Sequence, residues 1–113
     1  MEARSIPINQ IDSMSRAGRY FSSFTRQIKA KGAESLPPIP VFQLPKELNT
    51  ELPYSNMDGG HRLSAHIAAG ETEIRCIVFG PNDDPEEISS LTGGGHPISY
   101  DACIRTYKRR RGL

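Results

Sequence analysis

The segment YSNMDGGHRLSAHIAAGETEIRCIVF, which runs from Tyr54 to Phe79, carries the clearest structural pattern in the chain. Its first residues predict a short strand. Apolar side chains then recur at helical spacing, so residues 61–69 predict a helix that ends at Gly70. Residues 73–79 are rich in β-branched side chains and predict a second strand. The run DGGHR, Asp58 to Arg62, therefore forms a glycine-rich corner between a strand and a helix.

The preceding segments predict further short elements. Residues 4–12 alternate imperfectly between apolar and polar and predict a first strand that runs into a turn. Large apolar residues recur every four positions from Tyr20 to Ile28 and predict a helix that ends at Gly32. A strand is predicted at Val41–Leu44. We expect residues 1–80 to form the nucleus of one domain.

The composition changes after Gly80. Residues 81–97 mix acids, prolines and glycines and predict a loop with a short helical turn near Asp84–Leu91. The final segment predicts a short helix that ends in a basic tail. We expect residues 81–113 to pack on the same domain rather than to form a second one.

The bulk composition limits the class of protein. The chain has 113 residues, 36% of them hydrophobic, and a formal net charge of only +1, which fits one domain without strong overall attraction to nucleic acid. No apolar run is long enough to span a bilayer, and the N-terminus does not resemble a secretory signal. Cys76 and Cys103 lie far apart and lack the spacing of a zinc site. These features favour a reduced, cytoplasmic protein without a membrane partner.

The glycine-rich corner suits an anion. The first backbone N–H groups of a helix lack intrahelical partners, and the helix dipole adds partial positive charge there. Glycines allow close approach to a phosphate, Arg62 offers a charge-assisted contact, and His61 a hydrogen bond. Asp58 is a candidate helix cap, magnesium ligand or base. The alternative is purely structural, because aspartate and glycine also begin ordinary helices.

Several motifs occur in the order seen in the ParB/sulfiredoxin superfamily. DGGHRLSAHIAAGETEIRCIVF resembles its phosphate-binding box, helix and following strand. RSIPINQI resembles its opening strand, and FTRQIKAKGAESLPPIPVF resembles its helix and the Pro-Ile-x-Val strand that follows. Together the match runs from Arg4 to Phe79.

The resemblance implies a small α+β fold, with a mixed sheet flanked by helices, and a nucleotide site. It implies Mg²⁺ with a nucleoside triphosphate or diphosphate as cofactor. Asp58, His61 and Arg62 are the implied catalytic residues, and Asp58 the implied metal ligand. The residues implied to bind nucleotide are Gly32, Pro38, Ile39, Gly59, Gly60, His61 and Arg62.

The sequence also departs from the family. Sulfiredoxins carry a catalytic cysteine directly before the His-Arg pair, where this chain has Gly60, which argues against sulfinic acid reduction. The further nucleotide motif and the helix-turn-helix domain of chromosome-partitioning ParB proteins are not recognisable. Serine-kinase relatives use a glutamate outside the box, and no motif selects among Glu34, Glu47 and Glu51.

Three functions follow as hypotheses. The first is nucleotide phosphate binding with NTP hydrolysis or phosphoryl transfer. The second is a ParB-like nuclease or regulatory module that contacts nucleic acid through the basic tail Lys108, Arg109, Arg110 and Arg111. The third is a non-catalytic interaction protein whose corner is only structural.

Three residues outside the box each have two possible interpretations. His96, between a glycine run and a proline, is either an ordinary loop residue or part of a lid over a nucleotide. Arg16 and Arg19 are candidates to reach a bound phosphate, although a solvated helix face is the simpler interpretation.

Overall fold

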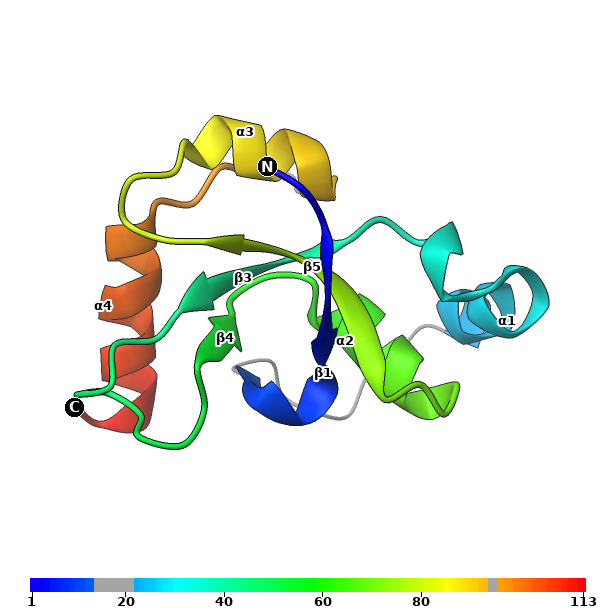
Figure 1. Ribbon diagram of the computed structural model, residues 1–113, viewed down its shortest axis with the longest axis horizontal. Coiled ribbons are helices and arrows are strands. Elements are labelled where there is room, and N and C mark those ends of the chain that lie inside the picture. Colours follow the sequence, from blue (N-terminus) through cyan, green and yellow to red (C-terminus); the bar gives the residue numbers. More distant parts are fainter. Residues whose placement is uncertain (14–21, 94–95) are drawn as a thin grey trace.

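The computed structural model describes residues 1–13, 22–93 and 96–113. Its sheet has five strands in the order β1-β5-β3-β4-β2 (Figure 1). The strands are β1 (Arg4–Pro7), β2 (Ile11–Ser13), β3 (Ile39–Gln43), β4 (Tyr54–Asn56) and β5 (Glu73–Phe79). β3 pairs in parallel with β5, and β2 with β4, whereas β1 with β5 and β3 with β4 are antiparallel. The sheet is therefore mixed, as predicted.

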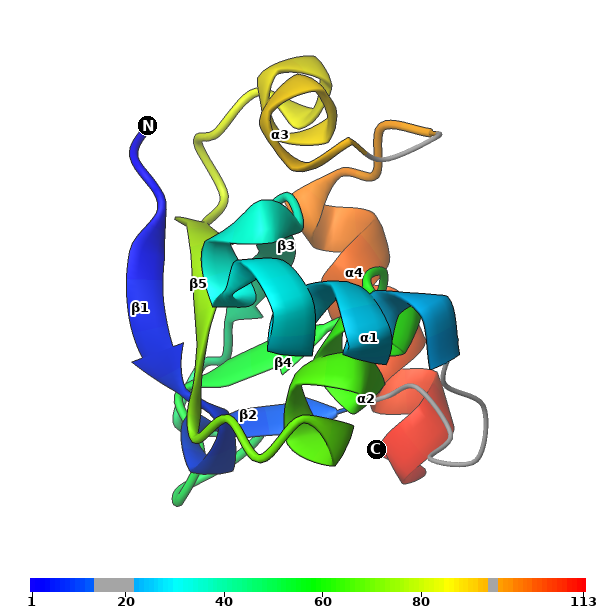
Figure 2. The same ribbon diagram turned by 90° about the vertical axis from the view of Figure 1, so that its right-hand side faces the viewer.

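In the described part of the chain, four helices accompany the sheet: α1 (Ser22–Lys31), α2 (Gly60–Ala68), α3 (Pro85–Thr92) and α4 (Tyr100–Arg111). Short 3₁₀ turns occur at Ile8–Gln10 and Ala33–Ser35. Figure 2 shows α1 running alongside α2, and α3 lying beyond one end of the sheet. The predicted α+β class is confirmed.

The two faces of the sheet bury different cores because successive side chains of a strand point in opposite directions. Ile39 and Val41 of β3 belong to a cluster that includes Leu63 of α2. Phe42, the residue after Val41 on β3, points to the opposite face and belongs to a second cluster with Tyr107 of α4. Helices therefore cover both faces. The ring centroids of Phe42 and Tyr107 lie 6.3 Å apart in an edge-to-face contact.

The N-terminal segment is a strand that runs into a turn, as predicted: β1 is followed by the 3₁₀ turn at Ile8–Gln10. The short strand β2 after this turn was not predicted. Pro7 ends the first ladder, and the N–H of Ile8 instead donates to Thr72 O at 2.9 Å. The turn redirects the chain so that β1 and β2 lie at opposite edges of the sheet.

The C-terminal third is more regular than predicted. The helical turn expected near Asp84–Leu91 is the complete helix α3, because Asp84 caps it and Glu86 and Glu87 favour its positive end. The basic residues 108–111 also do not form a tail beyond the helix. They form the last turn of α4, where cationic side chains interact favourably with the negative end of the helix dipole.

Candidate functional site

Gly59 shapes the corner between β4 and α2. It adopts φ 79° and ψ 14°, a left-handed conformation that other residues rarely accept. A Cβ atom at this position would lie 2.7 Å from Cγ2 of Ile39, so β3 passes directly beneath the turn. The first glycine of the box is therefore required by packing as well as by backbone conformation. Gly60 is the first residue of α2.

The N-terminus of α2 lacks the side-chain cap that α3 and α4 have. Asp84 Oδ1 caps α3 by accepting from the amide of Glu86 at 3.0 Å, and Ser99 Oγ caps α4 by accepting from Ala102 at 3.2 Å. At α2 the capping position is Gly59, which has no side chain to offer, and the first turn contains no acid. The N-cap residue of α2 therefore places no side-chain oxygen next to the partial positive charge at this end of the helix.

Asp58 lies one residue too early to cap α2, so the capping interpretation is wrong. Its Oδ1 accepts from the amide of Gly59 at 2.8 Å, and its backbone carbonyl accepts from Nδ2 of Asn56 at 3.2 Å. The residue is exposed. These two contacts hold the aspartate at the mouth of the corner, and its exposure leaves the carboxylate accessible to a ligand.

Arg62 links three segments through one nitrogen. Its Nη1 donates to the carbonyls of Pro38 at 3.0 Å, Thr92 at 2.8 Å and Pro37 at 3.2 Å. Thr92 is the last residue of α3, where carbonyls lack intrahelical partners and a cation is favoured. Burial lowers the pKa of Arg62, and the nearby Asp58 carboxylate opposes that shift. The guanidinium remains charged at neutral pH.

The other edge of Arg62 is close to the glycine turn. Its Nη2 lies 3.7 Å from the position that a Cβ on Gly59 would occupy. Nη1 thus anchors the side chain while Nη2 sits beside the start of α2. His61, the next member of the box, is exposed on the first turn of the helix.

The predicted nucleotide-facing residues separate into two groups. Pro38 and Ile39 adjoin the corner, the first through its carbonyl and the second beneath Gly59. Gly32 ends α1, where its amide donates to Ile28 O at 2.8 Å, as the predicted helix stop requires. Its left-handed φ of 94° serves that turn. Its recorded contacts are local and give it no link to the corner.

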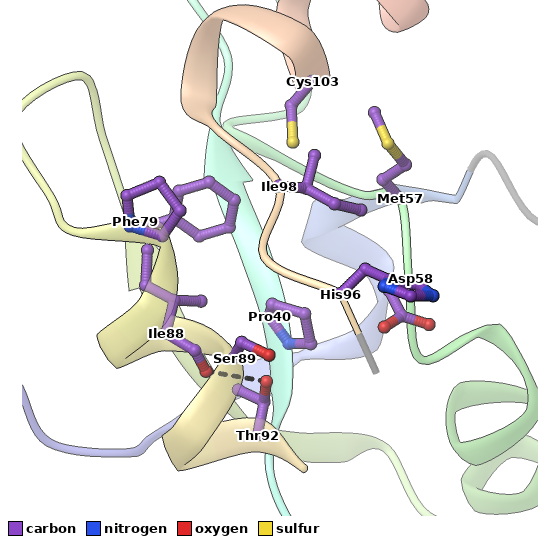
Figure 3. A pocket seen from close by; sticks show the side chains of 11 residues that line it. Pro40, Met57, Asp58, Phe79, Ile88, Ser89, Thr92, His96, Ile98 and Cys103 are labelled. Atoms are coloured by element: carbon purple, nitrogen blue, oxygen red, sulfur yellow. Dashed lines mark hydrogen bonds between the residues drawn. The ribbon is translucent and has the colours of Figure 1, made fainter. Parts of the chain in front are cut away.

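A small cavity of about 30 Å³ lies beside the corner (Figure 3). We call it the Asp58 pocket. Its walls come from β3, β5, α3, α4 and the segments around residues 57–58 and 96–98. The lining residues are Pro40, Met57, Asp58, Phe79, Pro85, Ile88, Ser89, Thr92, His96, Ile98 and Cys103.

Sequence reasoning missed most of this pocket. Ser89 and Thr92 carry no motif, and the pocket arises only when α3 folds over the sheet. Two of its lining residues were singled out in the sequence: Asp58 belongs to the box, and the place of His96 after the glycine run suggested a lid. Arg16 and Arg19 lie outside the described residues.

The last turn of α4 divides the predicted basic tail. Lys108, Arg109 and Arg110 are exposed. Arg111 instead forms an ion pair with Asp12 of β2, and its Nε donates to Asp12 Oδ2 at 3.2 Å. The hydroxyl of Tyr107 donates to the same oxygen at 2.7 Å. Arg111 thus helps to dock α4 against β2.

Two further observations bear on partners. Within the described ranges, no three His, Cys, Asp or Glu side chains gather closely enough to hold a metal ion. In the same ranges, no helix has both the length and the apolar character needed to cross a bilayer. Burial raises the pKa of both cysteine thiols to about 12, as expected for small buried hydrophobic residues.

Comparison with known proteins places the fold. No protein-family model and no curated protein sequence matches the chain. Among solved structures it resembles sulfiredoxin from Arabidopsis thaliana, with 21% identity, a TM-score of 0.56, and coverage of 71% of this chain and 86% of that one. This likeness concerns the fold alone.

Two structures of truncated ParB from Caulobacter crescentus are also similar. The complex with CTP-gamma-S has 25% identity, a TM-score of 0.55, and coverage of 74% of this chain and 47% of that one. The complex with the centromeric parS site has 26% identity, a TM-score of 0.52, and coverage of 71% and 42% respectively. The chain therefore matches less than half of the length of either ParB structure.

These structural likenesses cover 71–74% of the chain. The chain has a ParB/sulfiredoxin-like fold.

Proposed function

We propose that this protein binds the phosphates of a nucleoside triphosphate or diphosphate at the N-terminus of α2. The observation that carries the proposal is an uncapped helix N-terminus with a guanidinium beside it. Gly59 brings the backbone close to β3, and Gly60, His61 and Arg62 form the first turn. The N-terminus of a helix attracts anions through the amides of its first turn and through its dipole. The ParB neighbour complexed with CTP-gamma-S supports the choice of a nucleotide.

Each residue of the box has a distinct proposed task. The amides of Gly60 and His61 would donate to phosphate oxygens, and the imidazole of His61 would add a hydrogen bond. Nη2 of Arg62 would neutralise phosphate charge while Nη1 stays with the backbone carbonyls. Pro38 and Ile39 would border the ribose or base, since they adjoin the corner. Gly32 would help to shape the loop that leads to them.

The residues present fit Mg²⁺ only as an ion that arrives with the nucleotide. Asp58 is a lone carboxylate, and the described residues hold no metal cluster. Mg²⁺ commonly combines one carboxylate with substrate phosphates and water, so Asp58 would complete such a shell. The bound ion would neutralise phosphate charge. The proposed reaction is NTP hydrolysis or phosphoryl transfer, in which Asp58 serves either as this metal ligand or as the base, and positioning is the main source of rate.

A thermal-shift assay tests nucleotide binding. ATP, CTP, GTP and ADP would be compared with and without Mg²⁺. A ligand at a hundredfold its Kd adds about 2.7 kcal/mol to the free energy of unfolding. His61→Ala should reduce the nucleotide-dependent shift, whereas Arg105→Ala on the exposed side of α4 should leave it unchanged. No shift with any nucleotide would contradict the proposal.

Nucleic-acid binding is the second candidate, and the exposed side chains of Lys108, Arg109 and Arg110 favour it. A ParB neighbour is complexed to the parS site, which makes the partner class reasonable. Replacing the three residues by serine should weaken DNA binding and flatten its salt dependence. Nucleotide stabilisation should persist in that variant. Unchanged DNA affinity would remove this candidate.

A further inference from the structure

The glycine-rich corner contains Asp58, the one aspartate of the sequence that is followed by glycine. No asparagine of the chain precedes a glycine. A main-chain amide nitrogen can attack the side-chain carboxyl group of the residue before it, and glycine permits this most readily because it has no side chain to obstruct the approach. The bond between Asp58 and Gly59 is therefore the place where the chain is most prone to rearrange.

The two groups that would react are already in contact. The amide of Gly59 donates to Asp58 Oδ1 at 2.8 Å, so the carboxyl group is turned towards the next residue in the chain. The carbon under attack, Cγ, is bonded to this oxygen, and geometries close to reaction hold the reacting atoms about 3–3.5 Å apart. Asp58 is also exposed, so water can leave and enter at its carboxyl group.

Positive charge lies beside the attacking nitrogen, which must lose its proton to react. Gly59 is the N-cap residue of α2, where the helix dipole places partial positive charge. Nη2 of Arg62 lies 3.7 Å from the position that a Cβ on Gly59 would occupy. Both features favour the negative charge that develops on the nitrogen and on the carboxyl oxygen as the new bond forms.

The fold does not allow the glycine to be replaced by a larger residue that would slow the attack. Gly59 has a φ of 79°, and a Cβ there would lie 2.7 Å from Cγ2 of Ile39. Backbone conformation and packing therefore both require glycine at this position. The residue that shapes the corner is thus the same one that leaves Asp58 open to attack.

We propose that Asp58 is a site of spontaneous isomerisation to isoaspartate in the folded protein. The nitrogen of Gly59 bonds to Cγ of Asp58, and the amide proton leaves with the carboxyl OH as water, which gives a succinimide ring. Water then adds to one of the two ring carbonyls. Cleavage of the bond from nitrogen to Cγ restores aspartate, whereas cleavage of the bond from nitrogen to the main-chain carbonyl carbon gives isoaspartate. Water is the only co-reactant, and the composition of the chain is unchanged.

Isoaspartate would disrupt the corner. The main chain would run through Cγ and so lengthen by one carbon, and the free carboxylate would move onto Cα. In the unmodified chain, Gly59 packs over Ile39 while its carbonyl accepts from the amide of Leu63 at 3.0 Å, the first hydrogen bond of α2. A longer connection could not hold both contacts. The modified protein should therefore unfold at a lower temperature than the unmodified protein.

Peptide mapping of aged protein tests the proposal. The folded protein is incubated without nucleotide at neutral pH and physiological temperature and is then digested. Isoaspartate changes the retention of a peptide without changing its mass, and a protein isoaspartate methyltransferase labels the new carboxylate. We expect isoaspartate to accumulate at Asp58 but not at Asp101, an exposed aspartate that is followed by alanine. Because no nucleotide is present, the result is independent of the proposed function.

Two substitutions at Asp58 test the ring closure itself. Asp58→Asn closes the same ring with loss of ammonia, so this variant should deamidate at this position in the folded protein. Asp58→Glu would require a larger ring, so it should abolish isomerisation while keeping the carboxylate. A synthetic peptide of residues 54–62 gives the rate without the fold, and we expect the folded protein to react at a comparable rate. If the peptide isomerises and the folded protein does not, or if the folded Asp58→Asn variant keeps its amide, the proposal is overturned.

Discussion

Arg62→Ala is the substitution that most directly tests how the corner is held together. Arg62 Nη1 donates to the carbonyls of Pro38 and Thr92, which belong to buried residues, and to the carbonyl of the exposed Pro37. Alanine removes the donor from all three. The start of β3 and the end of α3 then lose their shared contact with α2.

The expected cost follows from the two buried acceptors, Pro38 O and Thr92 O. A carbonyl deprived of its partner costs about 1–3 kcal/mol, and water entering beside this half-exposed site returns part of that energy. We therefore expect a loss of about 2–4 kcal/mol. With an unfolding entropy of about 2.1 cal/mol/K per residue, a chain of this size loses about 4 °C per kcal/mol, so Tm should fall by about 8–16 °C.

Differential scanning calorimetry without ligand measures this effect. Arg105→Ala is the control, because Arg105 is an exposed arginine on α4 and its loss should cost less than about 0.5 kcal/mol. Amide hydrogen exchange should also show that Arg62→Ala opens the end of α3 more than the rest of the chain. If the Arg62→Ala variant has the same Tm as the Arg105→Ala variant, the three carbonyl contacts do not form in solution.

Three further predictions concern other parts of the molecule. Gly59→Ala should lower the free energy of unfolding in urea by about 2–4 kcal/mol. The new Cβ would overlap Ile39, and a φ of 79° is strained for alanine. A loss below about 0.5 kcal/mol would contradict this geometry. Asp12→Asn should lower the free energy of unfolding by about 1–2 kcal/mol and speed amide hydrogen exchange in α4, because it weakens the ion pair and hydrogen bonds that dock this helix. Unchanged exchange in α4 would refute this role of Asp12. Neutral thiols at Cys76 and Cys103 should stabilise the fold below about pH 9 and lose this contribution as pH rises towards 12, because their folded pKa is raised from 9.0 to about 12. Serine at both positions should flatten the alkaline part of the stability profile, and an unchanged slope would argue against thiol titration.

The sequence predicted the corner and its flanking elements well because their signals are local. The spacing of apolar residues and the β-branched run located α2 and β5 to within a residue or two. Gly32 and Gly70 both adopt positive φ at the ends of helices, as predicted. The place of Gly59 at the turn was also predicted. Its contact with Ile39 could not be predicted, because it depends on how the strands pair.

The rest of the site depends on contacts between distant segments. Arg62 was assigned to phosphate from its motif alone, and nothing in the sequence places its Nη1 beside Thr92, 30 positions later. Arg111 looked like its three basic neighbours, yet it alone of that run pairs with Asp12 among the recorded salt bridges of the described residues. A charge pattern identifies candidate cations, but tertiary packing decides which of them are already used.

The pairing of Asp12 with Arg111, 99 positions apart, has a consequence for the order of folding. Contacts between remote segments form only after a large loss of chain entropy, so they tend to be late events. We expect the sheet to assemble around β3 and β5 before α4 closes over Phe42. During synthesis, the aromatic cluster on that face would stay exposed until α4 emerges, which makes this interval the one in which the nascent chain is most open to aggregation or chaperone capture.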